Sequence, residues 1–465
     1  MKSILFAVIG LLLLLIEPGF GQSLDRAGLG VMLMVVALLL LLHLMFNREK
    51  NWARIDTLFI ISYCVVNFQW PVLILIKKSY PAEWRFSSLA DQQMMYATWL
   101  GVVFLAVWLA GYWLPIGKTV SVMSPLRNRK ILKYTTVVIF LVFVFMSGKD
   151  YVSGKLYKES VEGVGIHGTV QGVAAYIYTI FQILVLVLVA WYVYGLKLRI
   201  ISGRSSWVKC LLGSKESLTT LLLLCVMCVY FLIAGERGQV IQICCAIGLA
   251  VGAAIRPVKL KSFVVALVAG AVLMTFVRYW RAGVDQTSMM LQNSHEIGAF
   301  EYSDSLAKSL YSTYVGMLLA NDSIGYYWGT LWISNILGVI PFAQKIFISI
   351  SGLSIQDISG PAAITTYVYG NDPMSGLGTT LVADLYMNLG KYFSIPVMMA
   401  YGWICQLFHN YIKGENGLLR FVMAVAFGSL IIYMPRAGLF TQLQPVIWGS
   451  VIALIFMRIK LNQPG

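Results

Sequence analysis

Four arginines stand where long apolar segments end, at positions that suit the binding of an anion. Arg237 lies within the sequence GERG, Arg278 and Arg281 within RYWR, and Arg436 within PRAG. A guanidinium group binds phosphate oxygens in bidentate fashion and stays protonated at any physiological pH. Together the four could hold a diphosphate and neutralise the charge that develops on it as a leaving group. The alternative for any one of them is an arginine that reaches lipid headgroups.

A second group of candidates lies in the run GLGTTLVADLYMNLG, which begins at Gly376. Gly376 and Gly378 predict a flexible turn, and Thr379 and Thr380 place two hydroxyls at the start of a helix, where backbone N–H groups suit anionic oxygens. Asp384 follows one turn later, beside an apolar segment. Burial there would raise its pKa enough to make it a general base. The alternative is an acid that only interacts with the helix dipole.

Other chemistry has little support. His295 is a second candidate base, but no two histidines or cysteines have the spacing of a metal site, and the phosphate-loop, zinc-protease and serine-hydrolase motifs are absent. The sequence therefore predicts no metal and no cofactor. Aromatic residues that could stack on sugar rings, or form an interfacial belt, are Tyr302, Tyr311, Tyr314, Tyr326, Tyr327, Trp328, Trp332, Tyr367 and Tyr369.

The composition indicates what must position these residues. Of 465 residues, 59% are apolar and only 12% are charged, with a mean hydropathy of +0.77. A soluble domain carries about 25% charged residues, and a disordered chain is far less hydrophobic. We therefore predict an all-α polytopic membrane protein. Twelve apolar segments are expected to span the bilayer, at 3–17, 28–46, 57–76, 93–115, 134–148, 170–196, 218–235, 238–255, 262–278, 394–412, 418–434 and 439–459.

The basic residues predict the orientation. With the N-terminus in the cytoplasm, the inside segments hold 21 of the 35 Lys and Arg residues but only four of the 20 Asp and Glu residues. This is the bias expected when positive charge stays inside, so both termini should be cytoplasmic and the four arginines should face outward. Because the basic residues are dispersed over short loops, nucleic-acid binding is excluded. The first segment is expected to be a retained helix, with a cleaved signal peptide as the alternative.

We expect three regions along the chain. Residues 1–278 would form nine transmembrane helices, 279–393 one large periplasmic loop, and 394–465 the last three helices. Within the loop, the mostly apolar stretch 324–350 predicts a re-entrant or interfacial helix pair. A thirteenth span is the alternative, but it would place the C-terminus outside.

The sequence resembles the bacterial O-antigen polymerase (Wzy) family in the GERG motif at the outer end of a mid-chain span, in the GLGTTLVADLYMNLG motif before a late span, and in the large loop after the ninth span. The resemblance implies a glycosyltransferase C type fold in the inner membrane and a role in lipopolysaccharide biosynthesis. The implied reaction joins undecaprenyl-diphosphate-linked repeat units at the periplasmic face. The growing glycan would be the donor and a new lipid-linked unit the acceptor, and whether a chain-length-determining co-polymerase binds is left open.

Carried over by position, Arg237 matches the motif arginine of the family, and Asp384 stands where relatives have Glu or Asp. An arginine-x10-glycine pattern is met by Arg237 and Gly248, though with 41 glycines in the chain the match carries little weight. We expect the arginines to bind the donor diphosphate. Asp384 is the first candidate for the base that accepts the proton of the acceptor hydroxyl, and His295 is the second. The transfer is expected to invert the anomeric carbon and to need no metal.

Two other functions remain open at this point. An O-antigen ligase uses the same donor but transfers glycan to lipid A core, and it would be expected to centre on a loop histidine. A lipid-linked oligosaccharide flippase should show internal pseudo-symmetry and charged residues within its spans. The GTTLVADLY run favours the polymerase over the ligase, and neither sign of a flippase is present.

Overall fold

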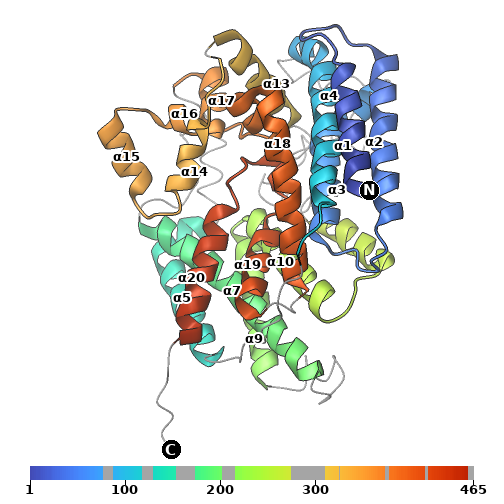
Figure 1. The fold of residues 1–465 in the computed structure, drawn as a ribbon. Helices are drawn as coiled ribbons and strands as arrows, with labels where there is room; N and C mark the ends of the chain where they lie inside the picture. The colour runs from blue at the N-terminus through green and yellow to red at the C-terminus, as the bar shows by residue number, and fades with distance from the viewer. Residues whose placement is uncertain are drawn as a thin grey trace, which may run out of the picture.

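The computed structural model describes residues 1–76, 87–117, 129–152, 173–201, 215–273, 309–323, 325–371, 376–413 and 417–458, and every regular element within them is helical (Figure 1). The all-α prediction is therefore confirmed for this part of the chain. The helices before the large loop are α1 (Lys2–Leu15), α2 (Arg26–Phe46), α3 (Ile55–Leu75), α4 (Ser87–Tyr112), α5 (Arg129–Val152), α7 (Val173–Ile201), α9 (Lys215–Ile233), α10 (Arg237–Ala254) and the helix Leu260–Leu273.

Six of the described helices are long and apolar enough to cross a bilayer, namely α2, α3, α4, α5, α7 and α10, and five more apolar helices are shorter. The chain is thus a polytopic membrane protein, as its composition predicts. Each of the twelve expected segments coincides largely with a helix, the last three with α18 (Leu381–Ile412), α19 (Leu418–Ser429) and α20 (Leu443–Arg458). Twelve crossings and the glycosyltransferase C type remain predictions.

Helix α4 forms the centre of one part of the bundle, where it contacts α1, α2, α3 and α18. Every residue from Gln93 to Tyr112 is buried. Two glycines let α4 and α18 approach backbone to backbone, because a Cβ at Gly111 would lie 1.9 Å from the Met399 carbonyl oxygen and one at Gly402 would lie 2.1 Å from the Trp108 carbonyl oxygen. Small residues commonly permit such close crossings between membrane helices.

The other part of the bundle is built around α7, which contacts α5, α10, α19 and α20. In Figure 1 these helices lie below and to the left of the N-terminal group. Helix α19 joins the two parts, since it contacts both α7 and α18. The result is a continuous apolar core from α1 to α20.

A polar network ties together the connections at the end of the bundle predicted to be cytoplasmic. Asp56 is fully buried and accepts hydrogen bonds from Arg54 Nε (3.0 Å) and Nη2 (2.7 Å). In the connection between α2 and α3, Glu49 accepts from Lys413 Nζ (2.7 Å) and contacts His409 Nε2 (3.3 Å) at the end of α18. The hydrogen bond with His409, aided by Lys413 and opposed by desolvation, lowers the pKa of Glu49 to about 2.

Residues 309–323 and 325–371, which fall within the predicted large loop, form short helices in the upper part of Figure 1, and the last residues of that predicted loop already belong to α18. The short helices are α13 (Leu310–Leu318), the π-helix η1 (Leu319–Ser323), η2 (Thr330–Trp332), α14 (Ile333–Leu337), α15 (Ala343–Ser351), α16 (Ile355–Ile358) and α17 (Gly360–Tyr369). The stretch 324–350 thus holds α14 and α15, of five and nine residues. Neither reaches the roughly 20 residues that a crossing needs, and whether they dip into the membrane remains a prediction.

The loop is fastened to α18 where that helix breaks. Gly390 has φ 65° and ψ −175°, so the helical hydrogen bonds are interrupted there. The carbonyls of Met387 and Asn388 instead accept from the backbone N–H groups of Tyr327 (2.9 Å) and Trp328 (2.8 Å). A Cβ at Gly390 would lie 2.7 Å from the ring of Tyr326. Glycine at this position therefore lets the loop pack directly on α18.

Candidate active site

Asp384 lies in the first turn of α18, ahead of the Gly390 break and outside the expected span 394–412. Its side chain is buried, with 1% of its surface exposed. Oδ2 accepts hydrogen bonds from the indole Nε1 of Trp332 (2.9 Å) and from the backbone N–H of Leu439 (2.8 Å). Desolvation by burial outweighs these two donors and raises the pKa of Asp384 to about 6. A carboxyl group that ionises close to neutral pH is suited to general base catalysis.

The second carboxylate oxygen faces two glycines. The hydrogen bonds that described residues donate to Asp384 both end on Oδ2. A Cβ placed on either Gly360 or Gly438 would lie 3.3 Å from Oδ1, and one on Gly438 would also lie 3.1 Å from Asn335 Nδ2. The start of α17 and the segment after η3 (Met434–Arg436) therefore both approach Oδ1, and Asn335 of α14 lies next to Gly438. Because both glycines lack a Cβ, they do not crowd the oxygen that would take a proton.

The structure brings Arg237 and Arg436 to one neighbourhood. Arg237 is the first residue of α10 and is partly exposed, whereas Arg436 ends η3 and is exposed. The Tyr433 hydroxyl donates to the carbonyl of Gly238 (3.2 Å), which fixes the η3 turn against the start of α10. Both guanidinium groups lie close enough to interact electrostatically with that hydroxyl.

The η3 turn also connects the arginines to the buried carboxylate. Arg436 is three residues before Leu439, whose N–H binds Asp384 Oδ2. The aromatic ring of Phe440, the next residue, packs edge-on against Trp332 at a centroid distance of 5.3 Å. One short segment therefore carries a cation of the expected clamp and a hydrogen-bond donor to the expected base.

The Gly-Thr-Thr segment has a structural role in α18. Gly378 adopts φ 75°, and Gly376 is exposed. The Thr380 hydroxyl caps the helix by accepting from the N–H of its third residue (3.1 Å), and it lies 2.6 Å from the Thr313 hydroxyl of α13. Thr379 and Thr380 are both buried. The Thr380 hydroxyl is thus explained by helix capping and packing, whereas the Thr379 hydroxyl donates to the Thr380 carbonyl (3.3 Å). Contact of these residues with substrate remains a prediction.

Other expected residues cannot be compared in the same way. His295, Arg278 and Arg281 lie outside the described residues. Within the described part of the chain no three His, Cys, Asp or Glu side chains gather as a metal site would require; the absence of a metal from the reaction remains a prediction.

Sequence reasoning missed several residues around Asp384. Trp332 was expected only as a surface for sugars or as part of an interfacial belt, whereas its indole N–H binds the carboxylate. Gly438 is the last residue of the PRAG segment, but the sequence does not indicate its approach to Asp384. Asn335 and Gly360 are far from any motif, and no pattern in the sequence indicates that Gly360 approaches Oδ1 or that Asn335 lies next to Gly438.

The apolar helical bundle defines this chain as a polytopic membrane protein. Its candidate active site is a buried carboxylate at one end of the bundle, packed against short helices. The profile of the family described as O-antigen polysaccharide polymerase Wzy matches residues 2–463. The chain belongs to this family, as its motifs predict. No curated protein and no solved structure matched it significantly. Membership implies a polymerase activity in O-antigen polysaccharide synthesis, acting in a membrane on lipid-linked oligosaccharides.

Proposed function

We propose that this protein joins undecaprenyl-diphosphate-linked oligosaccharide repeat units into O-antigen polysaccharide at the periplasmic face of the bacterial inner membrane. The glycosyl transfer would invert the anomeric centre and need no metal. The observation that carries the proposal is the Asp384 carboxyl group, which is buried, has a pKa of about 6 and is bound to the segment that presents Arg436. Membership of the polymerase family supports it independently.

Asp384 is the general base of the proposed mechanism. Its Oδ1 would accept the proton of a sugar hydroxyl at the non-reducing end of the acceptor, while that hydroxyl oxygen bonds to the anomeric carbon of the donor glycan. The bond from that carbon to the diphosphate oxygen breaks, and undecaprenyl diphosphate leaves. Trp332 and Leu439 hold the carboxylate through Oδ2. Their donors fix its orientation, so that proton transfer needs little rearrangement. His295 is the second candidate for this role.

Arg237 and Arg436 would bind the diphosphate of the donor, together with Arg278 and Arg281 outside the described residues. Bond cleavage moves negative charge onto the diphosphate, and a guanidinium group already in place stabilises that charge. The arrangement around Tyr433 supports a shared task for two of the four. Removing one clamp should reduce the rate by about 10²–10³, or on the order of 3 kcal/mol. Gly376, Gly378, Thr379 and Thr380 would border the substrate on the α18 side.

A deletion strain distinguishes this proposal from its rivals. Without the polymerase, surface lipopolysaccharide should carry core capped with a single repeat unit, and the wild-type gene should restore the ladder of longer chains. Bare core would instead indicate a ligase. If reconstituted protein moved lipid-linked oligosaccharide across vesicles without lengthening it, the chain would be a flippase. Lengthening must also persist in excess EDTA; loss under the chelator, with recovery on adding a divalent ion, would contradict a metal-free reaction.

A further inference from the structure

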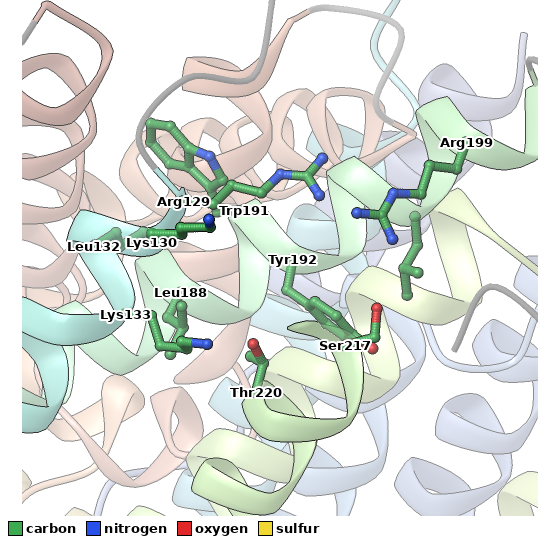
Figure 2. A pocket seen from close by; sticks show the side chains of 11 residues that line it. Arg129, Lys130, Leu132, Lys133, Leu188, Trp191, Tyr192, Arg199, Ser217 and Thr220 are labelled. Carbon is green, nitrogen blue, oxygen red and sulfur yellow. The ribbon is translucent and has the colours of Figure 1, made fainter. Parts of the chain in front are cut away.

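A basic recess lies between the ends of α5, α7 and α9, at the end of the bundle predicted to be cytoplasmic. Figure 2 shows its lining side chains. The recess is open to solvent, and its atom-free space of about 450 Å³ includes part of that solvent. It is lined by Arg129, Lys130, Leu132, Lys133, Leu188, Trp191, Tyr192, Leu196, Arg199, Ser217 and Thr220. None of these residues belongs to the candidate active site.

The recess carries concentrated positive charge. Arg129, Lys130, Lys133 and Arg199 all border it, and none of the eleven lining residues that the structure describes is acidic. In Figure 2 the Arg129 and Arg199 side chains extend toward one another across α7. Glu216 adjoins this region in the sequence, and counting it still leaves an excess of positive charge. The charge therefore favours an anionic ligand.

Neighbouring residues accommodate the basic side chains of the recess. A Cβ at Gly195 of α7 would lie only 2.3 Å from a terminal nitrogen of the Arg129 guanidinium, so glycine makes room for that group against the helix backbone. Lys133 Nζ donates to the Thr219 hydroxyl (3.0 Å), which links α5 to α9. The Ser217 side chain is buried beside them. Basic residues that served only to orient the chain in the membrane would need neither a recess nor a glycine fitted to one of them.

Apolar surface continues from the recess along two of its helices. On α5, Val138 and Leu141 are 56% and 58% exposed, and on α9, Leu218 and Leu222 are 51% and 63% exposed. Both helices begin at the recess, so these side chains lead away from the cations toward the bilayer core. A phosphate with acyl chains attached satisfies both surfaces, whereas a free phosphate would use only the charged one.

We propose that this recess binds the phosphate headgroup of an anionic phospholipid, whose acyl chains lie against α5 and α9. The site is separate from the proposed polymerase reaction. Its occupation would clamp α5 and α9 onto α7, because one anion contacts cations from two of these helices and hydroxyls of the third. A failure of lipid binding would leave the polymerase proposal untouched, and the reverse also holds.

The test measures stabilisation of the purified full-length protein by lipid in neutral detergent. Phosphatidylglycerol should raise the melting temperature saturably, whereas phosphatidylcholine and inorganic phosphate at equal concentration should not. The double variant K133Q/R199Q should weaken phosphatidylglycerol binding about tenfold or more, since each cation near a lipid surface contributes roughly 1 kcal/mol. The matched control K259Q/K261Q removes two exposed lysines from the same predicted face, outside the recess, and should bind like the wild type.

A second variant guards against a folding defect. Gly195→Ala keeps every charge but displaces the Arg129 guanidinium, whose flexible end can move, so it should weaken phosphatidylglycerol binding several-fold in a folded protein. The site is refuted if K133Q/R199Q and Gly195→Ala bind phosphatidylglycerol as tightly as the control does. Saturable stabilisation by inorganic phosphate, with displacement of the lipid, would refute the lipid headgroup as the source of the phosphate.

Discussion

Asp384→Asn is the perturbation that separates a general base from a structural acid. The replacement keeps the shape of the side chain, and an amide oxygen can still accept from Trp332 and Leu439. What it loses is the ability to take a proton. General base catalysis contributes typically 10²–10⁴ to a rate, so polymerisation should fall by about that factor while the fold persists.

Whereas the polymerisation rate of Asp384→Asn should fall, its stability at neutral pH should not. The pKa of Asp384 is about 6 in the folded protein against 3.8 as its ordinary value, so the folded state holds this proton more tightly than the unfolded chain does. The group therefore favours folding below pH ~4, and this contribution is lost as the pH rises through about 6. At 1.36 kcal/mol per pKa unit the loss is at most about 3 kcal/mol. Asp384→Asn should be at least as stable as the wild type at pH 7.5.

The assay is the initial rate of glycan lengthening by reconstituted protein between pH 5 and 8.5, with melting temperatures measured on the same samples. The wild-type rate should rise with an apparent pKa near 6 and level off above it. Asp384→Glu should keep part of the activity, with a shifted profile. A folded Asp384→Asn protein with wild-type rates and an unchanged pH profile would refute the assignment of the base.

Three further predictions follow from particular contacts. Arg237→Ala should lower the lengthening rate by about 10²–10³, and unchanged polymer length and yield on a lipopolysaccharide gel would remove the clamp from the mechanism. Gly390→Ala should lower both the melting temperature and the activity, because φ is 65° and a Cβ would lie 2.7 Å from the Tyr326 ring. Gly248→Ala, with no atom within 4 Å of its Cβ, should change neither. Equal melting temperatures for the two variants would show that the break in α18 does not hold the loop. The pKa of Glu49 is lowered to about 2 by its partner His409, so its contribution to stability is complete above pH ~4.5 and is lost as the pH falls toward 2. Between pH 6 and pH 3 the melting temperature of Glu49→Gln should therefore fall less than that of the wild type. An equal fall in both proteins would contradict the ion pair.

Much of the helical architecture could be predicted because the bilayer imposes a simple rule on sequence. A crossing needs about 20 apolar residues with internally paired backbone groups, and such runs are visible in the sequence. The same rule does not describe 324–350, which is as apolar as a span but is divided into α14 and α15. The backbone turns there at Gly329, Gly338 and Phe342 depend on packing, which hydropathy does not encode.

Only part of the candidate site could be predicted from the sequence. Asp384 and the arginines could be found because ionisable residues beside apolar runs are few. Their surroundings could not be found, since the hydrogen bond from Trp332 and the approach of Gly360 join segments that lie 52 and 24 residues away from Asp384 in the sequence. The two hydroxyls of the Gly-Thr-Thr segment suggest a ligand in the sequence, whereas capping of α18 explains that of Thr380 without one.

The central claim is that a lipid-linked donor places its diphosphate at Arg237 and Arg436, with the reacting carbon beside Asp384. An experimental structure with a non-reactive donor analogue and an acceptor bound tests this most directly. The account predicts diphosphate oxygens in contact with both guanidinium groups and an acceptor hydroxyl about 2.6–3.2 Å from Asp384 Oδ1. A diphosphate bound away from both arginines, with the anomeric carbon out of reach of Asp384, would contradict it.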